Sequence, residues 1–474
     1  MGAEEMTLAA FLDKSHSIAG PGFSRWLVPP AALCIHLCIG QAYAFSVFNK
    51  PLAQLLCSAQ NACPPATAKA ISTTPGDWAI TDLGWIFSLA IVFLGLSAAV
   101  FGRWVENKGP RTAMFAAACL FCGGLLVAAF GVSIHNLPIV FLGYGVIGGC
   151  GLGIGYISPV STLIKWFPDR PGLATGTAIM GFGGGALIGA PLAVALMKHY
   201  SSPTSNGVAP TMLTMAIIYF VFMIVGAMIV RLPAPGWRPT GWVPLTAAAS
   251  EARMMTTRNV TATEAIKTPQ FWLLWGVLFL NVTAGIGILG QASLMIQEMF
   301  GVTVAAAAGF VGLLSLFNMG GRIFWASMSD YLGRKKTYMI FFALGAILYA
   351  SVPTFGHWHA IVLFILAYGI ILTMYGGGFA TIPAYLRDMF GTIEVGAIHG
   401  RLLTAWSAAG VAGPVLVNYI RQSQIDHGVA KADAYSVVVY IMAGLLVIGF
   451  VLNWMVKPLD ERHYVQTGAA EATA

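Results

Sequence analysis

Twelve largely apolar runs divide this chain, and they constrain its structure more than any other feature. A helix that crosses a bilayer needs about 20 apolar residues. The chain has 57% hydrophobic and 9% charged residues, whereas an average soluble domain has about 25% charged residues. The sequence therefore predicts an all-α integral membrane protein with 12 transmembrane helices in a lipid bilayer. The runs lie near residues 26–48, 80–101, 112–131, 138–161, 173–197, 211–231, 270–297, 304–327, 338–356, 359–386, 396–420 and 433–455.

The runs form two sets of six, joined by a polar stretch. We expect an N-terminal tail over 1–25, a first half over 26–231, a linker over 232–268, a second half over 269–456 and a C-terminal tail over 457–474. Basic residues gather in the loops on the side that both termini share. The positive-inside rule therefore predicts cytoplasmic termini and a location in the cell (inner) membrane. These basic residues are Arg103, Lys108, Arg111, Lys165, Arg170, Arg253, Arg258, Lys267, Arg334, Lys335 and Lys336.

The two halves match each other at a nearly constant offset. Such a series indicates an internal duplication, and duplicated membrane halves typically place a site at their interface and work by alternating access. We therefore expect two pseudo-symmetric six-helix bundles. The pairs 224 residues apart are Glu106 with Asp330, Gly109 with Gly333, Pro159 with Pro383, Gly172 with Gly396 and Gly176 with Gly400, and Pro191 pairs with Pro414 at 223.

Several function classes find little support. No Cys/His/Asp cluster has the spacing of a metal site, and no Gly-rich loop leads into Lys-Ser/Thr, so we expect neither an enzyme nor a cofactor. The positive charge sits in short loops between apolar runs, so we expect no nucleic-acid partner. A receptor or a passive channel stays open as a rival to a carrier. Cys57 and Cys63 share a polar loop and could pair if that loop is external.

A charged motif follows the second run and recurs after the eighth. Residues 102–111 read GRWVENKGPR, and residues 326–336 read ASMSDYLGRKK. Here the sequence resembles the major facilitator superfamily, whose loop between helices 2 and 3 carries an acid, a glycine and a basic cluster. The resemblance implies a cytoplasmic gate, in which the acid meets the N-terminus of a facing helix and the bases bridge to carboxylates. The gating residues would be Arg103, Glu106, Arg111, Asp330 and Arg334. A solvated positive-inside loop is the alternative.

A second motif begins at Trp166 and reads WFPDRPGLATGTAIMG. It resembles the segment that enters helix 5 in monocarboxylate porters and their bacterial relatives, the oxalate/formate antiporter family. The likeness extends from residue 26 to residue 456. It implies a secondary transporter of a small carboxylate, with protons or a counter-anion as the coupled species. The same small residues would also serve close helix packing.

Arg322 is the most informative single residue. It lies eight positions before Asp330, or about 12 Å along a helix, which places it near the membrane midplane. A cation there is costly, and no Asp or Glu occupies the interior of a predicted span to neutralise it. The planar guanidinium can hold a carboxylate through two parallel hydrogen bonds. Snorkelling to the interface, or bonding to backbone carbonyls, is the alternative. The resemblance favours a substrate role, because porters of this family bind the carboxylate with an Arg at this place.

The chain departs from its relatives at three positions. Asn318 stands where the animal-type branch has an Asp, so a proton acceptor is missing there and Asn318 would be a neutral hydrogen-bonding partner. Oxalate-specific members place a Lys where Trp406 aligns. With one buried cation left, charge balance favours a monocarboxylate such as formate, lactate or pyruvate, and oxalate/formate exchange is the alternative. Val47 stands where animal-type porters have a Lys after Tyr-Ala-Phe.

Aromatic residues are expected to line the site. Tyr43, Tyr156, Tyr375 and Trp406 lie in the middle of runs 1, 4, 10 and 11. Their rings would bound the apolar body of a small substrate, and the tyrosine hydroxyls would orient its polar end. Packing or interface anchoring is the alternative for each of them.

Overall fold

The computed structural model describes residues 7–59, 75–244, 246, 254–289 and 291–465. Within this part of the chain, 12 helices are long and apolar enough to cross a membrane, which confirms the prediction of an all-α protein with 12 spans. Cys63 lies outside the described residues, so whether it pairs with Cys57 is not described. The chain divides into two compact units. Unit 1 comprises Met1–Thr162 and Gly181–Pro235, and unit 2 comprises Leu163–Met180 and Gly236–Ala474.

Unit 1 is a bundle built around α6, which packs against α10 and η4, while α2 packs on α10 and α5 packs on η4. Its first span passes from an α-helix into a 3₁₀ helix, and its fourth contains the π-helix η4. The elements from the N-terminus onward are α1 (Leu8–Leu12), η1 (Lys14–Ser17), η2 (Arg25–Leu27), α2 (Val28–Ile39), η3 (Gly40–Phe48), α3 (Asn49–Leu52), α4 (Leu55–Ala59), α5 (Ile80–Lys108), α6 (Pro110–Ser133), α7 (Leu137–Val140), η4 (Phe141–Gly148), α8 (Gly149–Trp166), α9 (Pro171–Tyr200) and α10 (Val208–Ile229).

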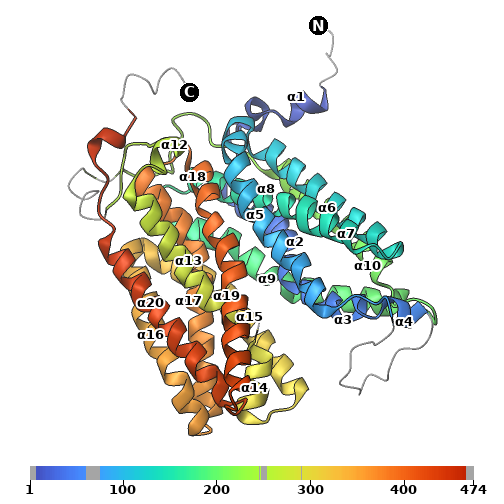
Figure 1. Cartoon of the computed structure of the whole chain (residues 1–474). Coiled ribbons are helices and arrows are strands. Elements are labelled where there is room, and N and C mark those ends of the chain that lie inside the picture. The colour runs from blue at the N-terminus through green and yellow to red at the C-terminus, as the bar shows by residue number, and fades with distance from the viewer. Residues whose placement is uncertain (1–6, 60–74, 245, 247–253, 290, 466–474) are drawn as a thin grey trace. The chain divides into compact units, whose positions relative to one another are not determined.

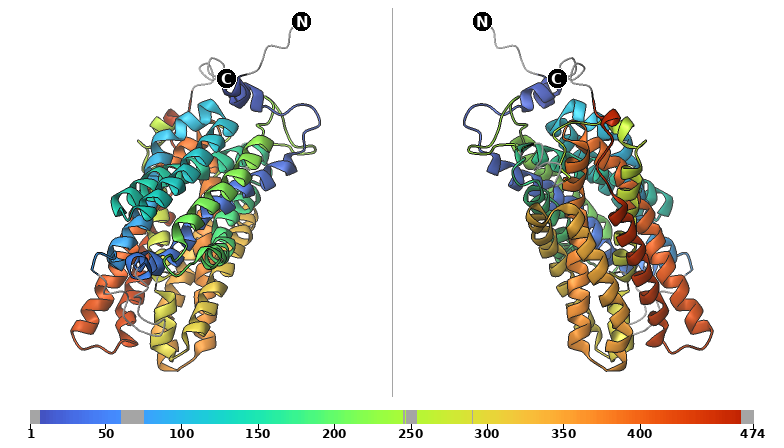
Figure 2. Two further views of the ribbon diagram at one scale, coloured as in Figure 1. Left: turned by 90° about the vertical axis from the view of Figure 1, so that its right-hand side faces the viewer. Right: turned by 90° about the vertical axis from the view of Figure 1, so that its left-hand side faces the viewer.

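In unit 2, α15 packs against α17, α13 against α19 and α20, and α16 against both α17 and α20 (Figure 1). These helices, coloured yellow to red, run alongside one another in both views of Figure 2. The remaining elements are α12 (Ala262–Ala265), α13 (Pro269–Leu289), α14 (Ala292–Phe300), α15 (Val304–Leu332), α16 (Arg334–His357), α17 (Ile361–Phe390), α18 (Val395–Leu402), α19 (Thr404–Asp426), η5 (Asp433–Tyr435), α20 (Ser436–Met455) and η6 (Glu461–His463).

The two charged motifs are mostly helical, where the apolar pattern had suggested loops. Helix α5 continues to Lys108 and α15 continues to Leu332, and each turn is made at one glycine. Gly109 and Gly333 have φ values of 85° and 86°, a region that glycine enters without strain. Glu106 and Asp330 therefore stand in the last turn of a helix, so their carboxylates have fixed positions.

The apolar run over 270–297 is shared between two helices of the described chain. Helix α13 ends at Leu289, and α14 begins at Ala292. The Gln291 side-chain amide donates to Asn418 Oδ1 at 2.5 Å, and Arg421 binds both oxygens of Glu298 at 2.6 and 2.7 Å. Polar contacts thus attach the outer piece of this span to α19.

Candidate functional site

Arg322 lies on α15 and is fully buried. Its guanidinium is held on two sides. Nε donates to Asn318 Oδ1 at 3.3 Å, one helical turn earlier, and Nη1 donates to the carbonyl oxygen of Ile179 on α9 at 3.0 Å. The third nitrogen, Nη2, is buried and has no hydrogen-bond partner among the described residues. The side chain therefore presents one N–H₂ group that an external acceptor could engage.

Charge balance distinguishes Arg322 from the other buried ionic groups of unit 2. Among the described residues of this unit, the side chains of Arg322, Arg334 and Asp388 are the charged ones classed as buried. Arg334 and Asp388 pair with each other at 3.0 Å. No carboxylate of the described chain lies within ion-pair distance of Arg322. A buried charge without a counter-ion is costly, so the surroundings of Arg322 favour an anionic ligand.

Phe379 on α17 connects Arg322 to two of the expected aromatic residues. The Arg322 guanidinium carbon lies 5.4 Å from the centre of the Phe379 ring, a cation–π distance. Phe379 also packs against Trp406 on α19 at 4.6 Å and against Tyr375 at 5.3 Å between ring centres. Arg322, Asn318, Tyr375 and Trp406 are thus brought together in unit 2, as a cluster whose centre, Phe379, the sequence analysis missed. Its spacing of four residues from Tyr375 was the available signal.

A close helix crossing brings Asn318 and Arg322 to this place. A Cβ atom at Gly376 of α17 would collide with the main-chain oxygen of Asn318 and would approach Arg322 Cγ to 3.1 Å. Gly376 therefore lets the backbones of α15 and α17 approach closely at Asn318. The guanidinium sits beside this crossing, where water is excluded.

Tyr43 and Tyr156 belong to unit 1 and form a separate aromatic group. Both make edge-to-face contacts with Phe182, at 5.1 and 5.3 Å between ring centres. Tyr156 is fully buried, and its carbonyl oxygen lies 3.3 Å from Nε2 of His36. Tyr43 is half-buried. Whether these two tyrosines touch a substrate stays a prediction.

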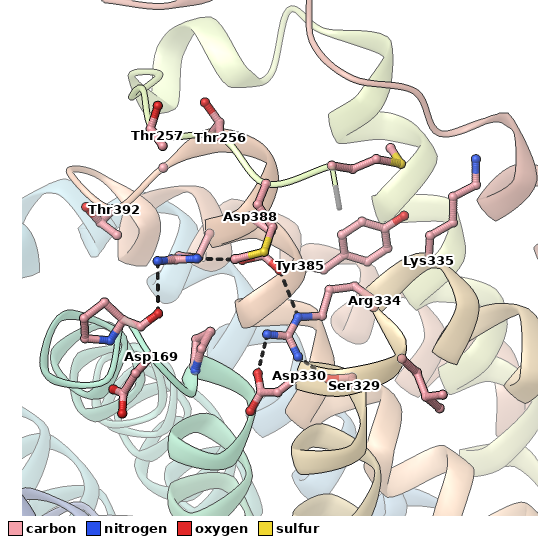
Figure 3. A pocket seen from close by; sticks show the side chains of 18 of the residues that line it. Asp169, Thr256, Thr257, Ser329, Asp330, Arg334, Lys335, Tyr385, Asp388 and Thr392 are labelled. Carbon is pink, nitrogen blue, oxygen red and sulfur yellow. Dashed lines mark hydrogen bonds and ion pairs between the residues drawn. The ribbon is translucent and has the colours of Figure 1, made fainter. Parts of the chain in front are cut away.

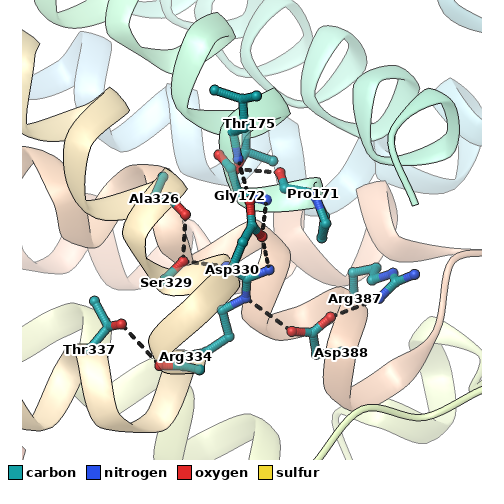
Figure 4. Close-up of polar contacts among 12 residues, drawn as sticks. Pro171, Gly172, Thr175, Ala326, Ser329, Asp330, Arg334, Thr337, Arg387 and Asp388 are labelled. Atoms are coloured by element: carbon teal, nitrogen blue, oxygen red, sulfur yellow. Dashed lines mark hydrogen bonds and ion pairs between the residues drawn. The ribbon is translucent and has the colours of Figure 1, made fainter. Parts of the chain in front are cut away.

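Asp330 receives the N-terminus of α9 at the end of unit 2. Its two carboxylate oxygens accept the N–H groups of Gly172 and Leu173 at 2.9 and 3.0 Å (Figure 4). These are unpaired donors of the first helical turn, where the helix dipole also favours an anion. Arg334 Nη2 binds the same carboxylate at 2.6 Å. Asp330 therefore connects α15 to both α9 and α16.

Two members of this network, Arg387 and Asp388, were not predicted from the sequence. Arg334 Nε binds Asp388 at 3.0 Å, and Arg387 Nη1 binds the other oxygen of Asp388 at 2.9 Å. Arg387 also donates to the carbonyl oxygen of Pro168 at 3.4 Å. We call Asp330, Arg334, Arg387 and Asp388 the gate cluster. An adjacent Arg-Asp pair at the end of the tenth apolar run was the available signal.

The matching residues of unit 1 have different partners. Glu106 accepts a hydrogen bond from Ser161 Oγ at 2.6 Å. Arg111 is buried beneath the N-terminal segment, where Nη1 donates to the Phe11 carbonyl at 2.7 Å and the guanidinium lies 4.6 Å from the Phe11 ring centre. Arg103 lies on the exposed side of α5. In unit 1 two of the residues predicted to form the gate, Glu106 and Arg111, therefore contact a serine hydroxyl and the N-terminal segment.

A cavity in unit 2 adjoins the gate cluster and does not include Arg322. It has a volume of about 1030 Å³ and opens between the α15–α16 turn, the end of α17, residues 168–171 and part of the linker (Figure 3). Arg322 instead lies in tightly packed surroundings, so any ligand there requires side-chain or helix movement.

Comparison with known proteins gives one family. The model of the Major Facilitator Superfamily matches residues 31–414 and 324–473. The chain is 29% identical to the oxalate:formate antiporter of Oxalobacter formigenes over 69% of this chain and 73% of that one. It is 24% identical to apicoplast pyruvate carrier 1 of Toxoplasma gondii over 75% of this chain and 72% of the other.

A solved structure shares the fold. The human organic anion transporter MFSD10 superposes with a TM-score of 0.65 at 15% sequence identity, covering 92% of this chain and all of that one.

Proposed function

We propose that this chain, which belongs to the major facilitator superfamily and is therefore a secondary transporter, carries small monocarboxylates such as formate, lactate or pyruvate by alternating access. The observation that supports this substrate class is the fully buried guanidinium of Arg322, which has no carboxylate partner among the described residues and a free Nη2. The relatives that are named for formate, oxalate and pyruvate agree with a small carboxylate.

The substrate carboxylate would bind at Nη2 and at one neighbouring nitrogen. A two-bond clamp needs two adjacent N–H groups on the same edge of the guanidinium. Nε has a single N–H, which donates to Asn318, so a carboxylate on the Nε edge displaces Asn318. Nη1 has two N–H groups, one of which donates to Ile179, and we propose that a carboxylate on the Nη1 edge competes with that carbonyl. The bond from Nε to Asn318 is longer than the bond from Nη1 to Ile179, and the Asn318 amide can rotate away. The Ile179 carbonyl, in contrast, can withdraw only if α9 moves.

Displacement of Ile179 gives a route from substrate binding to helix movement. The first part of α9, residues 171–180, is attached to unit 2 by three sets of contacts. Asp330 binds its N-terminus, Thr175 donates to the Ala380 carbonyl at 2.7 Å, and Arg322 binds the Ile179 carbonyl at 3.0 Å. A carboxylate that binds Nη1 would remove the contact between Arg322 and the Ile179 carbonyl. Substrate binding would thereby favour release of α9.

Trp406 supports a monoanion over a dianion. It is fully buried against Phe379, which itself contacts Arg322, so an indole occupies the place where a second cation would be needed. An oxalate dianion bound to Arg322 would leave one carboxylate without an opposite charge, and this residual charge opposes binding. Apolar surroundings suit the methyl or hydrogen end of a monocarboxylate.

The gate cluster would close the cytoplasmic side. We place the end of unit 2 that carries the gate cluster, and both termini, on the cytoplasmic side of the cell (inner) membrane, because basic residues gather there. Asp330 contacts both α9 and α16, and we propose that this network opens when α9 undocks. Tyr43, Tyr156 and Tyr375 are proposed to shape the passage.

Oxalate/formate exchange is the second candidate, because the relative of that name is 29% identical over 69% of the chain. Protons or a counter-anion could be the coupled species. Both questions are answered by one experiment. Purified protein in proteoliposomes is given labelled formate, lactate, pyruvate or oxalate, with and without a pH gradient and with each unlabelled anion inside. We expect saturable uptake of a monocarboxylate and weak uptake of oxalate, whereas a receptor would show no uptake and a channel no counterflow.

A further inference from the structure

The cavity beside the gate cluster has more basic than acidic side chains in its lining. Its lining includes six basic and three acidic side chains. Asp330 and Asp388 are already neutralised by Arg334 and Arg387 within the gate cluster. The other basic residues of the lining are Arg238, Arg258, Lys335 and Lys336. Asp169 opposes them within the lining, and Glu461 lies 4.0 Å from Arg258, so a positive surplus remains.

These basic side chains differ in the contacts that they make with the rest of the protein. Lys335 donates to the carbonyl oxygens of Trp454 and Val456 at 2.8 and 2.7 Å, which satisfies the end of α20. Arg258 lies over the Tyr464 ring at 4.6 Å. Arg238 and Lys336 are exposed, and their side chains make no ion pair or hydrogen bond with any part of the chain that the structure describes. Two cations are thus available to an anion in the cavity.

The wall opposite the gate cluster is ordered by backbone contacts. The linker donates from Thr256 N to the Asp388 carbonyl at 2.7 Å, and from Val260 N to the Phe390 carbonyl at 2.9 Å. Asn259 Oδ1 accepts the N–H of Thr392 at 2.9 Å. The cavity is therefore a built concavity on the end of α17, whereas positive-inside loops alone would leave the same charges dispersed in solvent.

The rim of the cavity is apolar and lies at the ends of membrane spans. Tyr331 and Trp454 both line the cavity and are 76% and 64% exposed. They stand at the ends of the spans Ala306–Leu332 and Asp433–Met455, the depth at which aromatic side chains meet lipid headgroups. A basic cavity with an aromatic, membrane-level rim fits an amphipathic anion better than a soluble one.

We propose that this cavity binds the phosphate-bearing headgroup of an anionic phospholipid. The phosphate would lie near Arg238 and Lys336, and the acyl chains would pass over Tyr331 and Trp454. Because Asp388 accepts from Arg334 and its carbonyl holds the linker, a lipid in this cavity would stabilise the docked arrangement of the gate cluster. This site is separate from Arg322 and does not depend on which solute is transported.

The test measures thermal unfolding of delipidated full-length protein in detergent, titrated with phosphatidylglycerol or with phosphatidylcholine. Wild type should be stabilised by phosphatidylglycerol, with little effect of phosphatidylcholine. The double variant Arg238→Gln/Lys336→Gln should bind phosphatidylglycerol roughly 30-fold more weakly, since each basic residue near a lipid surface contributes about 1 kcal/mol. The control Lys198→Gln/Lys431→Gln, which removes two exposed lysines outside the cavity lining, should behave as wild type.

Two results would overturn the proposal. Equal stabilisation of the cavity variant and wild type by phosphatidylglycerol would show that the lipid acts elsewhere. Stabilisation of wild type by inorganic phosphate or glycerol phosphate at concentrations as low as those of the lipid would identify the ligand as a soluble phosphate and not a lipid.

Discussion

A guanidinium in an apolar helix bundle requires acceptors for its five N–H groups. Arg322 finds two, the amide oxygen of Asn318 and the carbonyl of Ile179, and its Nη2 remains without one among the described residues. Leaving a buried donor unsatisfied costs about 1–3 kcal/mol. A bound carboxylate would remove that cost and supply the missing negative charge. The empty state is thus destabilised at the atom where the substrate would bind.

The first prediction concerns the shape of this cation. Arg322→Lys should leave the folded protein intact and reduce transport by roughly 10- to 100-fold, because an ammonium cannot reproduce two parallel hydrogen bonds that are each worth about 1.5–3 kcal/mol. The measurement is initial uptake of the best monocarboxylate in proteoliposomes. Arg462→Lys, an exposed residue, is the matched control. Uptake at the wild-type rate by Arg322→Lys would remove Arg322 from the site.

The second prediction concerns Trp406. Trp406→Lys should weaken binding of monocarboxylates, since two cations would then face one anion, and should raise the affinity for oxalate. Competition by unlabelled oxalate against a labelled monocarboxylate, in wild type and variant, reports the change. If wild type already binds oxalate as tightly as the monoanion, the argument from a single buried cation is wrong and oxalate/formate exchange becomes the leading function.

At the scale of elements, α9 is the helix whose movement the account requires. Its N-terminus is held by Asp330, and its fit against α15 depends on Gly176, where a Cβ would approach Arg322 O to 2.9 Å and Ala326 Cβ to 3.1 Å. Helices that cross this closely separate when a small residue is enlarged. The contact between α9 and α15 can therefore be altered at Asp330 or at Gly176 without changing Arg322.

Gly176→Ala should push α9 away from α15 and weaken the bond between Ile179 O and Arg322 Nη1. With a competing acceptor weakened by about 0.5–1.5 kcal/mol, substrate binding should tighten roughly 2- to 10-fold while turnover falls. Equilibrium binding and uptake are compared in the same preparation. Gly320→Ala on α15 is the control, because a Cβ there meets nothing within 4 Å. Weaker substrate binding by Gly176→Ala would refute competition between Ile179 and the substrate.

Asp330→Asn should shift the balance between inward- and outward-open forms toward the form in which α9 is undocked. The change removes the charge that meets the helix N-terminus and Arg334, contacts worth roughly 2 kcal/mol together. Cysteine-accessibility labelling measures the shift. Glu106→Gln, which alters the hydrogen bond with Ser161, should also change the labelling, whereas Lys108→Gln, an exposed change, should be nearly silent. Unchanged labelling in both acid variants would contradict the gate.

At the scale of the whole molecule, much was accessible from the sequence. Hydrophobicity over a whole run is a strong signal, so the 12 spans and the family were predicted. Arg322 could also be identified from the sequence, since a charged residue inside an apolar run is exceptional. Phe379 could not, because an aromatic in an apolar helix looks like any packing residue. The role of Asp388 and the start of a second helix, α14, after Gln291 were not predicted, because each depends on contacts between helices, with Arg334 and with Asn418 respectively.

The most direct test of the central claim is counterflow in proteoliposomes loaded with an unlabelled monocarboxylate. A carrier that binds its substrate through Arg322 should accumulate labelled formate, lactate or pyruvate transiently above equilibrium, saturate with external concentration, and lose most of this activity in Arg322→Lys. Oxalate should compete weakly. Absence of counterflow with every carboxylate, or uptake that rises linearly without saturation, would contradict the account.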